Sequence, residues 1–111
     1  MWLDAGPLDS IPRRGARVLR TTQADIALFR TADDAVYALL DRCPHRGGPL
    51  SQGLVHGRCV TCPLHDWVID LATGEASEPD EGETATFEVR VHAGRVLVRA
   101  IDAAAFDGRG R

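Results

Sequence analysis

The sequence predicts an all-β protein, and two observations support this prediction. Eleven glycines and six prolines are spread along the 111 residues and divide the chain into short runs. Turn signals at this density favour strands over long helices. Residues 87–99 show the clearest period, because Phe87, Val89 and Val91 alternate with polar residues up to a turn at 93–94. This pattern is typical of a β-hairpin with one buried face.

Three earlier segments are also predicted to form hairpins. The first, residues 26–40, has two apolar runs on either side of an Asp-Asp pair. Its second run also fits one face of a short helix, and the period alone does not separate the two in so few residues. We interpret this run as a strand. The second hairpin is residues 54–61 with a turn at 56–57, and the third starts at residues 68–69 and turns at Gly74, which supplies a positive φ.

Length and composition predict one domain that spans residues 1–111. A second domain of ordinary size does not fit in a chain of 111 residues. Residues 101–111 are expected to form one helical turn and a frayed tail. Only 5% of the residues are aromatic, so the apolar core is thin and a further source of stability is expected.

Charge and cysteine content exclude several classes of protein. The formal net charge of −3 argues against a nucleic-acid-binding or polybasic membrane-binding surface. Three cysteines are too few, and odd in number, for a disulfide scaffold. No apolar run approaches the ~20 residues of a membrane span, and the N-terminus lacks the layout of a signal peptide. We therefore expect a cytoplasmic protein that binds neither nucleic acid nor membrane.

One segment is strongly acidic. Residues 66–88 contain eight acidic residues and no basic residue. This run is interpreted as a solvated loop, and the alternative is a docking surface for a basic partner, which would show as salt-sensitive association. Its central carboxylates are Glu75, Glu78, Asp80, Glu81 and Glu83.

Two short clusters carry the candidate chemistry. The first is a C-P-H run that begins at Cys43, and the second is a C-P-L-H run that begins at Cys62. Soft thiolates and neutral imidazoles suit either an iron–sulfur cluster or zinc. Each cluster places one Cys and one His on a loop, so one iron of a 2Fe-2S cluster can take both thiolates and the other iron both imidazoles. Zinc fingers usually keep their two cysteines together along the chain. The spacing favours iron and sulfide, with a non-redox, zinc-stapled assembly domain as an alternative. The four candidate ligands are Cys43, His45, Cys62 and His65.

At these two clusters the sequence resembles the Rieske family. The family's boxes match C-P-H-R-G-G from Cys43 and C-P-L-H from Cys62 in ligand type, internal gaps and separation. With the flanking strands, the resemblance covers about residues 15–100. It implies a base of antiparallel strands, a β-sandwich or barrel, and a small cluster-binding subdomain formed by loops at about 43–49 and 62–67. It also implies a Rieske-type 2Fe-2S cofactor bound by the four candidate ligands.

Within the family, residues 43–76 look most similar to the small subunit of NAD(P)H-dependent assimilatory nitrite reductase. This resemblance implies an electron-transfer subunit that is not catalytic alone. Its partner would be a large flavin, sirohaem and iron–sulfur subunit that reduces nitrite to ammonium. The Rieske ferredoxins of aromatic-ring dioxygenase systems, which are free-standing electron shuttles, are the alternative. In either case the imidazole edges of His45 and His65 are expected to be exposed to the partner.

Two departures from the high-potential respiratory members of the family are informative, and the second predicts a low reduction potential. Those members carry a second cysteine in each box, and the two form a disulfide; here Gly48 and Leu64 stand at these places. They also carry a serine that donates to a bridging sulfide, and here Trp67 stands at that place. We expect no disulfide between the loops. Because a hydrogen-bond donor is missing, we expect a midpoint in the lower part of the Rieske range of roughly −150 to +300 mV. A redox titration that gives a strongly positive midpoint would contradict this expectation.

The other residues of the two boxes are expected to shape the surroundings of the cluster. Glycines following the first ligands should let the backbone turn N–H groups toward the sulfides. Prolines should stiffen both loops, and the tryptophan should pack beneath the cluster as core. The arginine either contacts a partner, raises the cluster potential or is solvated. Cys59 forms a C-x-x-C with Cys62, yet its place in a predicted strand favours an inert thiol. The surrounding residues are Pro44, Arg46, Gly47, Gly48, Pro63, Leu64 and Trp67.

Overall fold

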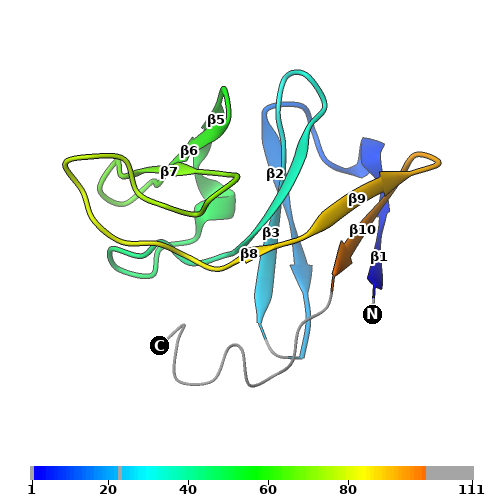
Figure 1. The fold of residues 1–111 in the computed structure, drawn as a ribbon, viewed down its shortest axis with the longest axis horizontal. Helices are drawn as coiled ribbons and strands as arrows, with labels where there is room; N and C mark the ends of the chain where they lie inside the picture. Colours follow the sequence, from blue (N-terminus) through cyan, green and yellow to red (C-terminus); the bar gives the residue numbers. More distant parts are fainter. Residues whose placement is uncertain (1, 23, 100–111) are drawn as a thin grey trace.

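The computed structural model describes residues 2–22 and 24–99, and its regular structure there is antiparallel strands with two single-turn 3-10 helices (Figure 1). The all-β prediction is confirmed. The expected helical turn at 101–111 lies outside the described residues. In chain order the elements are β1 (Trp2–Pro7), η1 (Leu8–Ser10), β2 (Gly15–Arg20), β3 (Asp25–Arg30), β4 (Val36–Leu40), η2 (Leu50–Gln52), β5 (Leu54–His56), β6 (Cys59–Thr61), β7 (Val68–Asp70), β8 (Thr86–Phe87), β9 (Val89–His92) and β10 (Arg95–Arg99).

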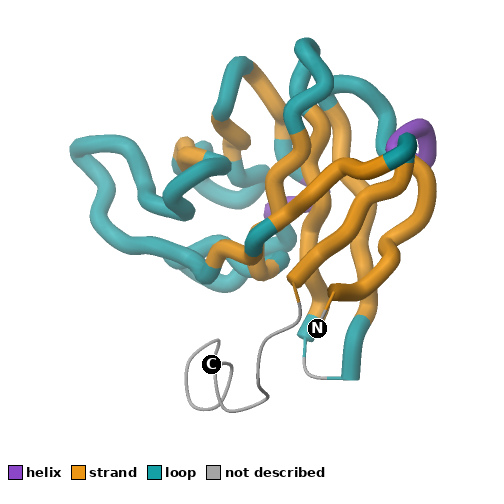
Figure 2. Tube along the Cα trace, turned by 45° about the vertical axis from the view of Figure 1, so that its right-hand side comes forward, coloured by secondary structure: helices purple, strands orange, loops and turns teal. Residues whose placement is uncertain are grey.

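The strands form three antiparallel sheets. Their strand orders are β1-β10-β9, β2-β3-β4-β8 and β5-β6-β7. The small β5-β6-β7 sheet stands apart from the other two, on the side where the long loops gather (Figures 1 and 2). This arrangement is a strand base with a separate small subdomain, as the family resemblance implied.

Strand β3 shows how the central sheet is covered on both faces. Its residues from 26 to 30 are all buried. Ile26 and Leu28 point into the core shared with the β1-β10-β9 sheet, which includes Val96. Ala27 and Phe29 point to the opposite face, into the core shared with the small subdomain. Successive side chains of a strand alternate between faces, so one continuous apolar run stabilises both layers.

Two local predictions about hairpins are confirmed. The β9-β10 hairpin turns at Ala93 and Gly94, whose φ values are +51° and +76°. Two consecutive positive φ values match the twist of a two-residue β-hairpin turn. The apolar run at Val36–Leu40 is strand β4, paired with β3. It is a strand rather than a helix because its centre is buried on both sides, by Ala38 on one face and Leu39 on the other.

Other segments differ from their predictions. Gly74 has the expected positive φ, +78°, but the predicted hairpin around it is not complete. Only β7 is a strand, and the returning chain pairs through a single bridge between Ile69 and Ala76. Strands β1 and β2 were not predicted. Strand β1 forms because it pairs with β10, for example Leu3 with Val98, and these partners are too distant in sequence for a local pattern to indicate.

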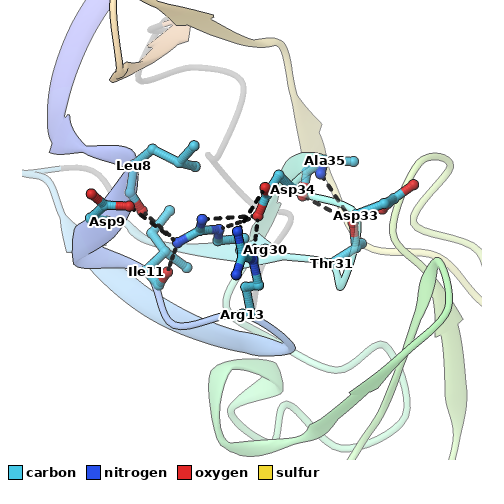
Figure 3. A network of polar contacts seen from close by, with 9 residues as sticks. All are labelled: Leu8, Asp9, Ile11, Arg13, Arg30, Thr31, Asp33, Asp34 and Ala35. Atoms are coloured by element: carbon cyan, nitrogen blue, oxygen red, sulfur yellow. Dashed lines mark hydrogen bonds and ion pairs between the residues drawn. The ribbon is translucent and has the colours of Figure 1, made fainter.

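A buried arginine ties the N-terminal segment to the central sheet (Figure 3). The Arg30 side chain is only 8% exposed. Its Nη1 donates to the carbonyl oxygen of Ile11 at 2.9 Å, and its Nε donates to Asp34 Oδ1 at 2.9 Å. Asp34 also accepts from Arg13 Nε at 2.8 Å. One carboxylate therefore neutralises a buried and an exposed guanidinium.

This network predicts an acid-dependent loss of stability. Hydrogen bonds from Arg13, and to a lesser extent from Arg30, lower the pKa of Asp34 from 3.8 to about 2 against the opposing effect of burial. Because the pKa in the folded state lies below the unfolded value, the carboxylate stabilises the fold above about pH 4, and this contribution is lost as the pH falls through about 2. The difference in unfolding free energy between wild type and Asp34→Asn should shrink over that range. Urea unfolding at stepped pH measures it, and a difference that is independent of pH would contradict the prediction.

Candidate metal centre

Two loops lie at the same end of the small subdomain. The first, residues 43–49, runs from β4 toward η2, and the second, residues 62–67, joins β6 to β7. The base of the first loop is closed by Ser51, whose N–H and hydroxyl donate to the Asp41 carboxylate at 2.7 and 2.8 Å. The base of the second is closed by the pairing of β6 with β7. Both loops are therefore held at their ends by regular structure.

The two loops close on themselves with the same backbone hydrogen bonds. In the first, the Cys43 N–H donates to the Gly48 carbonyl, and the Gly47 N–H donates back to the Cys43 carbonyl, both at 2.8 Å. In the second, the Cys62 N–H donates to residue 67 at 2.7 Å, and the Asp66 N–H donates back to Cys62 at 3.1 Å. The fourth residue after each cysteine has a positive φ, +73° at Gly47 and +59° at Asp66. Each loop thus presents its cysteine from an equivalent position, while the histidine is the second residue after Cys43 and the third after Cys62.

The four candidate ligands are brought together as two pairs. The thiols of Cys43 and Cys62 interact with one another, and the imidazole rings of His45 and His65 lie edge to face with centroids 4.6 Å apart. Each pair takes one member from each loop. The structure therefore places the two sulfur donors together on one side and the two nitrogen donors together on the other. In the sequence, by contrast, each cysteine lies next to a histidine.

The sulfur side is buried and the nitrogen side reaches the surface. Cys43 and Cys62 are 2% and 1% exposed. Burial raises the pKa of the Cys43 thiol, while N–H groups of the His45 and Arg46 backbone donate to its sulfur and partly counteract that rise. His65 is exposed. His45 is half-buried, with its Nδ1 atom covered, so the expected exposure is confirmed for His65, and the exposure of the outer edge of His45 stays a prediction.

The donors fit a binuclear cluster better than a single metal ion. The Nδ1 atom of His45 is buried and has no hydrogen-bond partner among the described residues, which is costly unless a ligand satisfies it. In residues 2–22 and 24–99, no three Cys, His, Asp or Glu side chains converge on one point that could hold a metal ion. A structural zinc needs four ligands on one ion, whereas a Rieske cluster needs two cysteines on one iron and two histidines on the other. Paired donors match the second requirement.

Gly48 and Leu64, which stand at the places of the second cysteines, lie next to one another. A Cβ atom on Gly48 would lie 2.5 Å from Leu64 Cδ1, so these two positions face one another across the loops. Cys43, Cys59 and Cys62 are free thiols. Gly47 has a φ of +73°, the positive φ on which the predicted turning of N–H groups toward the sulfides depends, and its own N–H donates to the Cys43 carbonyl. The backbone N–H groups of His45 and Arg46, the two residues after the proline, donate to the Cys43 sulfur.

The remaining predicted residues lie around the two pairs. Trp67 packs against the buried core of the subdomain, as predicted, and also stacks on the His45 ring. Pro63 and Arg46 are exposed beside the site, Pro44 is half-buried, and Leu64 is 52% exposed.

Cys59 lies outside the two donor pairs. It is half-buried in β6, paired across the sheet with His56 and Asp70. Burial, and then the nearby Asp70 carboxylate, raise the pKa of its thiol, so it stays protonated. These contacts are those of an inert thiol.

Sequence reasoning missed two residues of the site. Asp66 takes the left-handed conformation that closes the second loop, and aligning the two boxes on their cysteines would have placed it opposite Gly47. Gly82 lies against the first loop, because a Cβ there would be 3.1 Å from Pro44 Cβ. No local signal indicates that contact. Four of the five central carboxylates of the surrounding acidic run are exposed, and Asp80 is half-buried, which agrees with the solvated-loop interpretation.

The fold and the paired donors define a class, the small antiparallel β proteins that present two cysteines and two histidines from twin loops. A family model described as the Rieske [2Fe-2S] domain matches residues 1–88. The chain belongs to this family. It is an electron-transfer domain whose cofactor is a Rieske-type [2Fe-2S] cluster.

The matching proteins include ferredoxin components of dioxygenase systems and a nitrite reductase small subunit. The chain is 31% identical over 99 residues to the ferredoxin component of the naphthalene 1,2-dioxygenase/salicylate 5-hydroxylase systems of a Ralstonia species, covering 88% of this chain and 94% of the relative. It is 31% identical to a chain in the complex of reduced oxygenase and oxidized ferredoxin of carbazole 1,9a-dioxygenase, with a TM-score of 0.78 over 87% of this chain and 91% of that one. It is 25% identical to a protein named as a nitrite reductase NADPH small subunit, with a TM-score of 0.80 over 90% and 99% of the two chains.

Among the described residues there is no helix with the length and apolar character to cross a membrane. A cavity of about 300 Å³ lies where β8 leaves β4, between residues such as Tyr37, Leu71 and Phe87. None of the four candidate ligands lines it, so the cavity and the cluster site are separate.

Proposed function

We propose that Cys43 and Cys62 bind one iron of the cluster and His45 and His65 bind the other. The observation that carries this assignment is the sorting of the four donors into a buried thiol pair and a more exposed imidazole pair. When bound, the cluster accepts and donates one electron at a time. The protein surrounds the sulfur side with core residues and leaves the His65 imidazole open to solvent, so His65 is the edge nearest an approaching partner.

We further propose that the protein is a ferredoxin component that delivers electrons to an oxygenase partner. Identity to a ferredoxin component of a ring-hydroxylating system extends over nearly the full length of both chains, and a ferredoxin seen in complex with its oxygenase shares the fold at 31% identity. The residues that the structure describes form the strand base and the two cluster loops, and none of the four candidate ligands lines the cavity between β4 and β8. Catalysis on an organic substrate would therefore reside in the partner, in the cytoplasm.

A second candidate is the small subunit of an NAD(P)H-dependent nitrite reductase. The run of residues 43–76 favours it through its resemblance to that subunit family, and so does the shared fold with a protein of that name at 25% identity. In this case the protein would be bound permanently to a large flavin and sirohaem subunit rather than colliding with it.

The cluster assignment is tested by expressing the protein alone. We expect a red-brown protein with two irons and two acid-labile sulfides per chain and a rhombic EPR signal after reduction, since a Rieske cluster contains two irons. A colourless protein with stoichiometric zinc would contradict the assignment and support the assembly-domain alternative.

The two candidate roles are separated by gel filtration of the native protein from its source cells at low salt. A ferredoxin component should elute at the size of the free chain and, once reduced, should lose its EPR signal on mixing with a purified ring-hydroxylating oxygenase. A nitrite reductase subunit should elute with a large partner that shows sirohaem absorption. Co-elution with sirohaem would refute the ferredoxin role.

A further inference from the structure

The Trp67 indole lies flat on the imidazole of His45. The two ring centroids are 4.5 Å apart and the planes differ by 4°, so the rings are stacked face to face. The same imidazole contacts His65 edge to face. The His45 ring is thus contacted face to face by Trp67 and edge to face by His65, and both of these residues belong to the second loop.

The backbone of Trp67 is fixed independently of its side chain. Its carbonyl accepts the Cys62 N–H at 2.7 Å, which is the bond that closes the second loop. The residue is followed directly by β7. Trp67 lies where the second loop joins the paired strand β7, so its backbone is held in place. From this position its side chain reaches the first loop.

A third segment lies against the indole. A Cβ atom built on Gly82 would lie 3.6 Å from Trp67 Cζ3 and 3.1 Å from Pro44 Cβ. Gly82 itself is held by its carbonyl, which accepts the Ala76 N–H at 2.9 Å. The indole therefore contacts the first loop through His45 and lies beside the acidic segment at Gly82, which restricts its rotation.

We infer that Trp67 is a positioning residue, whose indole sets the plane of the His45 imidazole and thereby aligns the first cluster loop with the second. This inference rests on the proposed function, because it takes His45 as an iron ligand. The His45 ring has a buried Nδ1 atom without a hydrogen-bond partner among the described residues, so no hydrogen bond at this atom fixes the orientation of the ring. The edge contact with His65 and the flat stack with Trp67 remain, and of these two the stack constrains the plane of the imidazole more directly. Residues that orient a metal-bound histidine by a hydrogen bond change the affinity for the metal by roughly 10–100-fold. A stacking contact is expected to have a smaller effect on that affinity.

The test compares Trp67→Leu with Trp67→Phe and with Trp2→Leu as a matched control. Trp2 is the other tryptophan of the chain and lies under the Arg90 guanidinium in a different sheet. All variants are loaded with the cluster and reduced. Pulsed EPR then measures the nitrogen couplings of the two bound imidazoles, and a chelator assay measures the rate of iron loss.

We expect Trp67→Leu to shift or broaden the coupling of one imidazole nitrogen and to leave the other as in wild type. Iron loss should be roughly two- to tenfold faster, the range that corresponds to loss of one aromatic pair. Trp67→Phe should restore most of both properties, since it keeps a ring over His45. Trp2→Leu should match wild type in both.

Three results would overturn the inference. The first is wild-type couplings in Trp67→Leu, and the second is an equal change in Trp2→Leu, which would indicate general destabilisation. The third is a Trp67→Phe variant that changes both properties as much as Trp67→Leu does, because a ring over His45 would then have no orienting effect. If Trp67→Leu does not fold, Trp67→Met, which also removes the ring, takes its place in the comparison. Absence of two nitrogen couplings in wild type would refute the proposed ligands, and the inference with them, whereas intact wild-type couplings confine any failure to Trp67.

Discussion

Replacing Cys62 with serine is expected to remove essentially all iron and sulfide from the protein. A thiolate is a soft ligand suited to iron–sulfur clusters, and a serine hydroxyl does not replace it. The loss of affinity for iron should exceed the roughly 10–100-fold loss that follows removal of a hydrogen bond to a metal ligand. Because cluster binding is coupled to folding, and because the new hydroxyl would be buried at a site that is 1% exposed, the domain should also unfold at a lower temperature. Iron and sulfide analysis and a thermal melt measure both effects.

Cys59→Ser is the matched control for this prediction. Cys59 lies three residues before Cys62 and carries the same thiol, but it belongs to β6 and neighbours His56 and Asp70 across the sheet. Its variant should keep the colour, the iron and the EPR signal. Equal loss of iron from the two variants would mean that the proposed ligand set is wrong.

Replacing Arg30 with alanine is expected to lower the free energy of unfolding by roughly 2–4 kcal/mol. The Arg30 guanidinium satisfies the carbonyl of Ile11, a residue with no exposed surface, and alanine would leave that oxygen without its donor. It would also remove the buried contact to Asp34. Since Arg30 belongs to β3 and Ile11 follows η1, the variant should loosen the attachment of the N-terminal segment. Urea unfolding of the cluster-loaded protein measures the change.

Arg13→Ala separates the buried contacts from the ion pair. Arg13 binds the same carboxylate at 2.8 Å, but its side chain is 64% exposed. Exposed ion pairs contribute little to stability, so this variant should lose only a small part of what Arg30→Ala loses. Equal losses would show that the charge on Asp34, and not the buried carbonyl, accounts for the effect.

Local features of the sequence were enough to predict most strands. The β9-β10 hairpin follows from alternation and a turn with two residues of positive φ, both of which lie within a dozen residues. The interpretation of Val36–Leu40 as a strand was less secure, because it depends on burial of both faces by Ala38 and Leu39. That burial is a property of the assembled layers. Strand β1 was not predicted for the same reason, since its partner is β10.

The candidate ligands were predictable because the residues that bind a metal from one loop lie close together in the sequence. A Cys and a His on a turn, with one or two residues including a proline between them, point to metal binding wherever the loop lies. What the spacing did not contain is the grouping of the donors. Chain order pairs each Cys with the nearby His, whereas the structure pairs Cys43 with Cys62 and His45 with His65.

By itself, therefore, the sequence determined the strand class, the four candidate ligands and the family to which they belong, because each depends on residues close together in the chain. Only the tertiary structure decided that the donors form two pairs, that His45 is partly covered while His65 is exposed, and that Gly82 lies against the first loop. These features arise from packing between loops that are 20 to 40 residues apart. Burial and hydrogen bonding among distant segments select one arrangement there, and no local pattern records that selection.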